Sequence, residues 1–130
     1  MPEIIDYLAA PPVERGDGIV SVQLTPEPLD EQGFIMGTTL FPAGTGLALH
    51  CHNTIEQVTL LEGQALAEVD GRVYEAAPYD TTCVPAGVYH RWENAGVTPM
   101  RILWGYGSTY VTRTFLETGQ TVDQFGRIVE

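Results

Sequence analysis

The residues with the clearest chemical potential lie between positions 44 and 63, where two of the chain's three histidines stand one residue apart. His50 and His52 flank Cys51, and Glu56 follows four residues after His52. On a β-strand His50 and His52 point to one face and Cys51 to the other, because side chains alternate along a strand. Glu56 shares their parity beyond an Asn53-Thr54 turn, so we expect two imidazoles and a carboxylate to converge from adjacent strands. That donor set suits a divalent metal with open coordination positions.

The third histidine, His90, completes the donor set if its strand lies beside the first pair. Three imidazoles and one carboxylate suit Fe, Mn, Ni, Co, Cu or Zn, and ligand softness alone does not choose among these metals. The alternative is that the histidines are ordinary core or surface residues that bind nothing. Cys51, on the opposite face, is expected to pack rather than to bind the metal.

Two spaced motifs around these residues resemble the signatures of the cupin family. The first runs Gly44, five residues, His50, one residue, His52, three residues, Glu56, six residues and Gly63; the second runs Pro85, one residue, Gly87, two residues, His90, three residues and Asn94. Tyr79 stands where the second motif normally opens with a glycine. The resemblance implies an all-β double-stranded β-helix, a small jelly-roll barrel, with one divalent metal held by His50, His52, Glu56 and His90. It also implies a homodimer, since pairing of such barrels covers apolar outer faces and sheet edges.

The rest of the chain reads as short strands punctuated by glycine and proline. The strand-like runs cover residues 18–24, 33–41, 46–52, 55–61, 64–69, 72–76, 79–85, 87–92, 100–106 and 109–115. Asp70-Gly71, between two of these runs, is a type I′ hairpin signal. We therefore expect a single domain over residues 1–130, with a barrel core at about 18–107, an N-terminal arm at 1–17 and a C-terminal strand and tail at 108–130. Residues 2–10 have the pattern of one or two helical turns.

The composition restricts the partners. Six Lys+Arg against seventeen Asp+Glu give a formal net charge of −11, which argues against binding to nucleic acid or to an anionic membrane. The N-terminus lacks the pattern of a signal peptide, and no stretch reaches the roughly 20 apolar residues of a transmembrane helix. Two cysteines are too few for a disulfide framework. A cytoplasmic protein with free thiols is the expectation.

Strand parity also predicts the walls of a cavity beside the metal. The side chains expected to face inward are Ala48, Val58, Leu60 and Trp92, and also Trp104 and Tyr106 if the last barrel strand does not turn them towards a partner subunit. Leu47, Leu49 and Leu61 are expected to face outward. An apolar and aromatic lining is typical of a small-molecule pocket, and the alternative is that these side chains only fill the core.

The candidate catalytic residues are few. Tyr106 and Tyr74 are the inward tyrosines that this pattern offers for proton transfer. Arg113 lies in the tail, which can fold over a cavity mouth and bring the guanidinium to a carboxylate. The alternative for Arg113 is a surface ion pair with one of the seventeen acidic residues.

These residues favour a metal-dependent enzyme acting on a small organic molecule, with dioxygenase-type chemistry at Fe(II) as the first hypothesis. An apolar lining favours this chemistry over a carbohydrate site, which would show more Asn, Gln, Arg and Lys at inward positions. A second hypothesis is a redox-neutral lyase, isomerase or decarboxylase that uses Mn, Ni, Co or Zn. A third is a non-catalytic binding or sensor module. Fold and ligands are compatible with all three, so the reaction is not decided by them.

Overall fold

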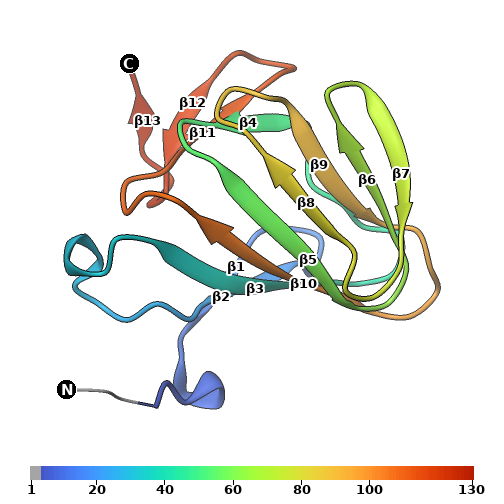
Figure 1. Ribbon diagram of the computed structural model, residues 1–130, viewed down its shortest axis with the longest axis horizontal. Helices are drawn as coiled ribbons and strands as arrows, with labels where there is room; N and C mark the ends of the chain where they lie inside the picture. The colour runs from blue at the N-terminus through green and yellow to red at the C-terminus, as the bar shows by residue number, and fades with distance from the viewer. Residues whose placement is uncertain (1–3) are drawn as a thin grey trace.

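Two antiparallel β-sheets face each other in the computed structural model, which describes residues 4–130 (Figure 1). The strands are β1 (Pro12–Glu14), β2 (Val20–Gln23), β3 (Ile35–Phe41), β4 (His50–His52), β5 (Glu56–Glu62), β6 (Ala65–Val69), β7 (Arg72–Ala76), β8 (Thr81–Val84), β9 (His90–Asn94), β10 (Met100–Tyr106), β11 (Thr112–Phe115), β12 (Thr121–Asp123) and β13 (Ile128–Val129). Single 3₁₀ turns, η1 (Tyr7–Ala9) and η2 (Leu29–Glu31), are the helical segments of these residues. The expected all-β fold is confirmed.

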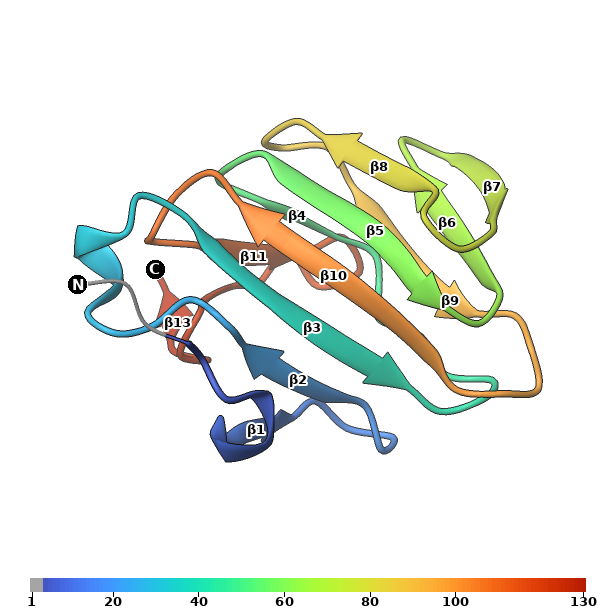
Figure 2. The ribbon, with the colours of Figure 1, turned by 60° about the horizontal axis from the view of Figure 1, so that its bottom comes forward.

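The chain crosses repeatedly between the sheets, as a double-stranded β-helix requires. One sheet has the order β1-β2-β3-β10-β5-β8, and the other has the order β13-β12-β11-β4-β9-β6-β7. Figure 2 shows the strands of the first sheet side by side, with β10 between β3 and β5. Neighbouring strands such as β4 and β9 therefore come from distant parts of the sequence, which is how residues 40 positions apart reach one site.

Period-two alternation builds the core between the sheets. Along β5 the buried positions are Glu56, Val58 and Leu60, and along β9 they are His90, Trp92 and Asn94. Inward positions therefore carry the histidines and Glu56 at one end of the barrel and mainly apolar side chains, with the buried Asn94, further along. Fully burying an aliphatic side chain such as Leu60 contributes roughly 1.5–3 kcal/mol.

The side chain of Asn94 joins the end of β9 to neighbouring segments of the barrel through hydrogen bonds. Its buried side-chain amide donates to the backbone carbonyls of Phe41 at 3.0 Å and Thr98 at 2.8 Å, and its Oδ1 accepts from the Gly96 amide at 2.9 Å. The last residue of the second motif therefore satisfies two backbone groups of the β9–β10 connection and one at the end of β3.

The predicted Asp70-Gly71 hairpin is confirmed, since both residues have positive φ, +51° and +81°, as a type I′ turn requires. The predicted strand at 46–52 is wrong in its first half. Only His50–His52 form β4, and before it Gly46 makes a single bridge to Glu93. A Cβ on Gly46 would lie 3.1 Å from that of Glu93, so this close crossing replaces a regular ladder.

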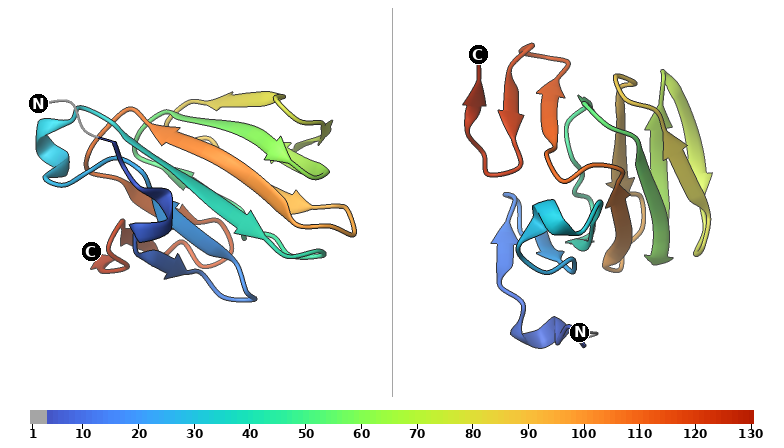
Figure 3. Two further views of the ribbon diagram at one scale, coloured as in Figure 1. Left: turned by 90° about the horizontal axis from the view of Figure 1, so that it is seen from below. Right: turned by 60° about the vertical axis from the view of Figure 1, so that its left-hand side comes forward.

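The expected arm and tail extend the sheets at their edges. β1 pairs with β2, and β11 pairs with β4 and carries β12 and β13 beyond it. Figure 3 (right) shows β1 and the β11–β13 segment on the same side of the molecule. Of the expected helical segment, η1 alone forms, with the Asp6 carboxylate accepting from the Leu8 amide; residues 2 and 3 lie outside the described part. Neither short turn in residues 4–130 has the length or hydropathy to cross a bilayer.

Candidate metal centre

Three buried histidines meet inside the barrel. β4 supplies His50 and His52, and β9 supplies His90, which pairs directly with His50 across the ladder. The strand of His90 therefore lies beside β4, as the donor set required. One nitrogen from each ring lies within 4.8 Å of the other two, a spacing that can hold a metal ion. All three residues are at most 4% exposed.

Backbone carbonyls fix the orientation of each ring. Every Nδ1 donates to a carbonyl oxygen: His50 to Ala48 at 2.6 Å, His52 to Thr112 at 3.0 Å and His90 to Val88 at 2.9 Å. A hydrogen on Nδ1 leaves the lone pair of a neutral imidazole on Nε2, the tautomer that metal-binding histidines use. The Nε2 of His52 is buried without a hydrogen-bond partner among residues 4–130, so the donor set fits a metal.

Glu56 faces the histidines from the opposite sheet. Its Oε1 lies 2.8 Å from Nε2 of His90 and 3.5 Å from Nε2 of His52. A buried carboxylate this close to two imidazole nitrogens requires a cation or a proton between them. Burial alone would raise the pKa of Glu56, but the imidazoles of His52 and His90 hold it well below its usual value.

The expectation that Glu56 lies on the strand adjacent to β4 is wrong. β4 pairs with β11 and β9, and β5 pairs with β10 and β8 in the other sheet. The connection through residues 53–55 carries the chain across the barrel instead of closing a hairpin. The parity argument still holds, because both strands present their inward face to the same interior.

Burial and neighbouring charges shift the pKa values of His50 and Tyr106 as well. Burial, followed by the charge of Arg113, lowers the pKa of His50 to about 3. Burial and the Glu56 carboxylate raise the pKa of Tyr106 far above its ordinary value. The Tyr106 ring lies 4.9 Å from that of His52, centroid to centroid. At neutral pH the site therefore holds a neutral His50 imidazole and a protonated phenol beside a carboxylate.

The histidines open into a cavity of about 540 Å³, within the usual range for small-molecule sites. Its walls include the predicted residues Val58, Trp92, Trp104, Tyr106 and Arg113.

Two predicted lining residues lie elsewhere. The chain before β4 is not a regular strand, so its side chains do not alternate between the two faces. Ala48 is therefore exposed, and Leu47 lines the cavity instead of facing outward. Leu60 is fully buried in the apolar core, further along β5 than the cavity. Tyr74 does not face inward, since it is 48% exposed on the outermost strand, β7.

The sequence argument missed the polar residues of the cavity. The additional polar lining residues are Glu14, Arg15, Ser21, Gln23, Thr39, Thr112, Asp123 and Gln124. Several come from the arm and the tail, where no local pattern marks a side chain as inward. The lining is therefore more polar than the apolar and aromatic wall that the barrel strands alone predicted.

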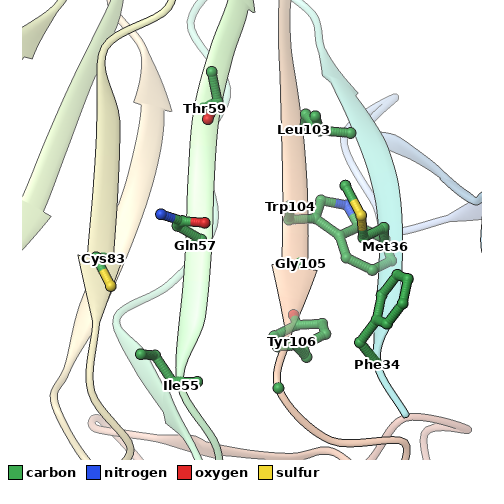
Figure 4. Close-up of a pocket in the computed structure, with 11 residues that line it drawn as sticks. Phe34, Met36, Ile55, Gln57, Thr59, Cys83, Leu103, Trp104, Gly105 and Tyr106 are labelled. Atoms are coloured by element: carbon green, nitrogen blue, oxygen red, sulfur yellow. The ribbon is translucent and has the colours of Figure 1, made fainter. Parts of the chain in front are cut away.

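A second, smaller depression of about 410 Å³ lies on the outer face of the six-stranded sheet (Figure 4). Phe34 and Met36 border it on one side, and Gln57 and Cys83 on the other. Gln57 thus faces away from the site, as strand parity predicted. Cys51 and Cys83 are both free thiols.

The amino-acid sequence is similar to a known domain family and to two known proteins. The profile of the cupin domain family matches residues 37–106. A 5-nitrosalicylic acid 1,2-dioxygenase of Bradyrhizobium sp. is 34% identical over 49% of this chain and 31% of its own length. An uncharacterised protein of Methanocaldococcus jannaschii is 33% identical over 52% of this chain and 55% of its own length. The chain thus spans about a third and about half of these relatives.

Solved structures agree on the fold. A predicted oxalate decarboxylase of Thermotoga maritima matches with a TM-score of 0.72 and 19% identity, covering 80% of this chain and 97% of its own. A sugar phosphate isomerase from a cupin superfamily, from Silicibacter pomeroyi, matches with a TM-score of 0.72 and 20% identity, covering 94% of this chain and 87% of its own. At these identities the likeness concerns the fold alone. With the family profile spanning more than half of its residues, this chain belongs to the cupin family.

Proposed function

We propose that this chain is a metal-dependent enzyme acting on a small organic molecule, with dioxygenase-type chemistry at Fe(II) favoured. The observation that carries the proposal is the convergence of three buried, backbone-oriented imidazoles at one wall of a 540 Å³ cavity. When bound, a divalent transition metal supplies Lewis-acid polarisation of a substrate or, as iron, chemistry with oxygen.

The chain's own residues have separate roles in this proposal. His50, His52 and His90 hold the metal through Nε2, and Glu56 is the fourth ligand, balancing part of the metal's charge. Tyr106 on β10 lies against His52, Trp104 packs beside Tyr106, and the two rings restrict water at this wall of the cavity. The named dioxygenase relative supports the choice of oxygen chemistry, over the half of this chain that it matches.

A redox-neutral lyase, isomerase or decarboxylase is the second candidate, and Tyr106 favours it. Such reactions need a proton donor or acceptor besides the ligands. The Tyr106 phenol lies in the cavity beside His52. A phenol at this position can donate a proton to a substrate carbanion or leaving group.

The deciding experiment measures metal identity and stoichiometry by elemental analysis of untagged protein. We expect about one metal ion per chain in the wild type and a large loss in His52→Ala and Glu56→Gln. Glu62→Gln is the matched control, because Glu62 lies on the same strand and pairs only with Arg101 at the surface. An oxygen-uptake screen over small aromatic and diketone-like compounds follows on protein loaded with iron.

The outcomes separate the candidates. Iron in the protein and oxygen uptake with a screened compound, both lost in His52→Ala, support the dioxygenase. Turnover with Mn, Ni, Co or Zn and no oxygen uptake, abolished in Tyr106→Phe, supports the redox-neutral enzyme. Tight ligand binding without turnover of any kind supports a binding module. Metal content near zero in the wild type, not restored by added divalent ions, contradicts the metal site itself.

A further inference from the structure

The arginines of this chain fall into two groups. There are six arginines and no lysine. Three arginines form ion pairs, Arg91 with Glu68 at 3.4 Å, Arg101 with Glu62 at 2.9 Å and Arg127 with Asp123 at 2.8 Å, and Arg72 is exposed on β7. Arg15 and Arg113 both line the cavity of the histidines, and neither forms an ion pair with an acidic side chain of residues 4–130. In a chain of net charge −11, two cations without an acidic partner are unusual.

Arg113 reaches the cavity from the seven-stranded sheet. It stands directly opposite His52 in the β11–β4 register, and opposed residues of an antiparallel pair project from the same face. Its Nε is buried and has no hydrogen-bond partner in the part of the chain that the structure describes. A buried charged donor without an acceptor costs free energy, so this position favours an incoming acceptor. The alternative of a surface ion pair is therefore wrong for Arg113.

Arg15 reaches the same cavity from the six-stranded sheet, just after β1. Its Nη1 makes only one long hydrogen bond, 3.5 Å to Oγ of Ser21. Burial, followed by the charge of Arg113, lowers the pKa of Arg15 to about 10, and the Glu56 carboxylate offsets only part of this effect, so the two guanidinium groups repel each other across the cavity. An anion between them converts this repulsion into two attractive contacts.

We propose that Arg15 and Arg113 bind a carboxylate of the substrate, so that this site takes small organic acids. That the bound acid is a substrate, and not only a ligand, rests on the proposed function. A guanidinium presents parallel N–H donors that match a carboxylate bidentately. Ile35, Val111 and Trp104 form an apolar cluster in the same wall, which suits a hydrocarbon body attached to the acid. The apolar cluster favours an organic acid over a phosphate ester or a sugar.

The test compares acids with their neutral amide twins on protein stripped of metal by a chelator. Binding of benzoate and benzamide, and of butyrate and butyramide, is measured by calorimetry. We expect each acid to bind wild type roughly tenfold more tightly than its amide, the size of a charge-assisted pair. Arg15→Gln and Arg113→Gln should each reduce that preference severalfold, and Arg72→Gln should leave it unchanged. Because no metal is present, this result is independent of whether the protein proves to be a metalloenzyme.

Two further readouts exclude a merely structural role. Without ligand, both glutamine variants should melt at the wild-type temperature or above it, because they remove repulsion between two cations. Arg113→Lys should retain part of the acid preference, because lysine keeps the positive charge but lacks the parallel N–H donors of a guanidinium. Acids and amides bound equally, no acid bound at all, or a preference that persists in Arg15→Gln overturn the proposal. Inorganic phosphate displacing benzoate at equal concentration overturns the carboxylate assignment. Arg15 follows an edge strand, so its variant decides the matter if Arg113→Gln does not fold.

Discussion

At the scale of single residues, the candidate ligands depend on backbone atoms from three separate segments. The carbonyls of Ala48, Val88 and Thr112 each accept from one histidine ring. Ala48 was expected to contribute its side chain to the cavity, yet it contributes its carbonyl oxygen and leaves the methyl group exposed. Strand parity predicts where a side chain points, but it does not identify which carbonyl will orient a ring. The ligand types could be read from the sequence, and the bonds that fix their tautomers could not.

The buried imidazole of His50 predicts a pH dependence of stability. Its pKa is lowered to about 3 in the folded protein from 6.5 ordinarily. Between these two pH values His50 is protonated in the unfolded chain and neutral in the folded chain. The free energy of unfolding therefore rises with pH and falls on acidification. For metal-free protein we expect the free energy of unfolding to fall by about 2 kcal/mol between pH 7.5 and pH 5 through this group.

Urea unfolding of chelator-treated protein at several pH values measures this effect. His50→Asn is the control, because the asparagine amide can still donate to the Ala48 carbonyl but does not titrate in this range. We expect a smaller loss of stability in the variant over the same interval. Equal pH dependence in both proteins would show that His50 is not the responsible group.

At the scale of elements, long alternating runs were predictable and short edge strands were not. The runs that became β3, β5 and β10 each have seven residues with inward apolar positions, so period two is visible in the sequence. β1, β12 and β13 have two or three residues, and β1 and β13 are wholly exposed. Such short segments are strands only because a partner strand lies beside them, and the identity of that partner is not a local property.

Tyr79 offers a test at this scale, because it occupies a position that suits glycine. Its φ is +75° and its side chain is 78% exposed, so a β-carbon is strained there without packing in return. We expect Tyr79→Gly to be more stable than Tyr79→Ala by about 1 kcal/mol, because both lack the ring and only alanine keeps the β-carbon. Chemical denaturation of the two variants gives the difference. An alanine variant equal to or more stable than the glycine variant would contradict the left-handed conformation.

At the scale of the whole molecule, the cavity is assembled from the arm, the barrel and the tail. The four candidate ligands stand in two motifs of the barrel, and their spacing was sufficient to group them. Arg15 and Gln124 stand outside those motifs, and they reach the cavity only when β1 and β12 add to opposite sheets. The sequence therefore grouped the candidate metal ligands and singled out Arg113, whereas Arg15 and Gln124 could be assigned to the cavity only from the folded chain.

The outer face of the six-stranded sheet supports a final prediction, that the protein is a homodimer joined through this face. None of the eleven residues that line its depression is charged, and Phe34 and Ile55 are each 48% exposed (Figure 4). Two copies of a chain with net charge −11 repel each other over most of their surfaces, so we expect them to meet where charge is absent.

Light scattering after size exclusion should give twice the 14.2-kDa chain mass for untagged protein. Leu103→Glu places a charge on this face and should give monomers, because a carboxylate buried between two copies would have no partner. Val73→Glu is the control, since Val73 is 60% exposed on β7 of the other sheet and should leave the dimer intact. A monomeric wild type contradicts the dimer, and a Leu103→Glu protein that stays dimeric places the interface elsewhere. Since β10 carries Leu103 on its outer side and Trp104 in the cavity wall, dimerisation through this face would also stiffen one wall of the site.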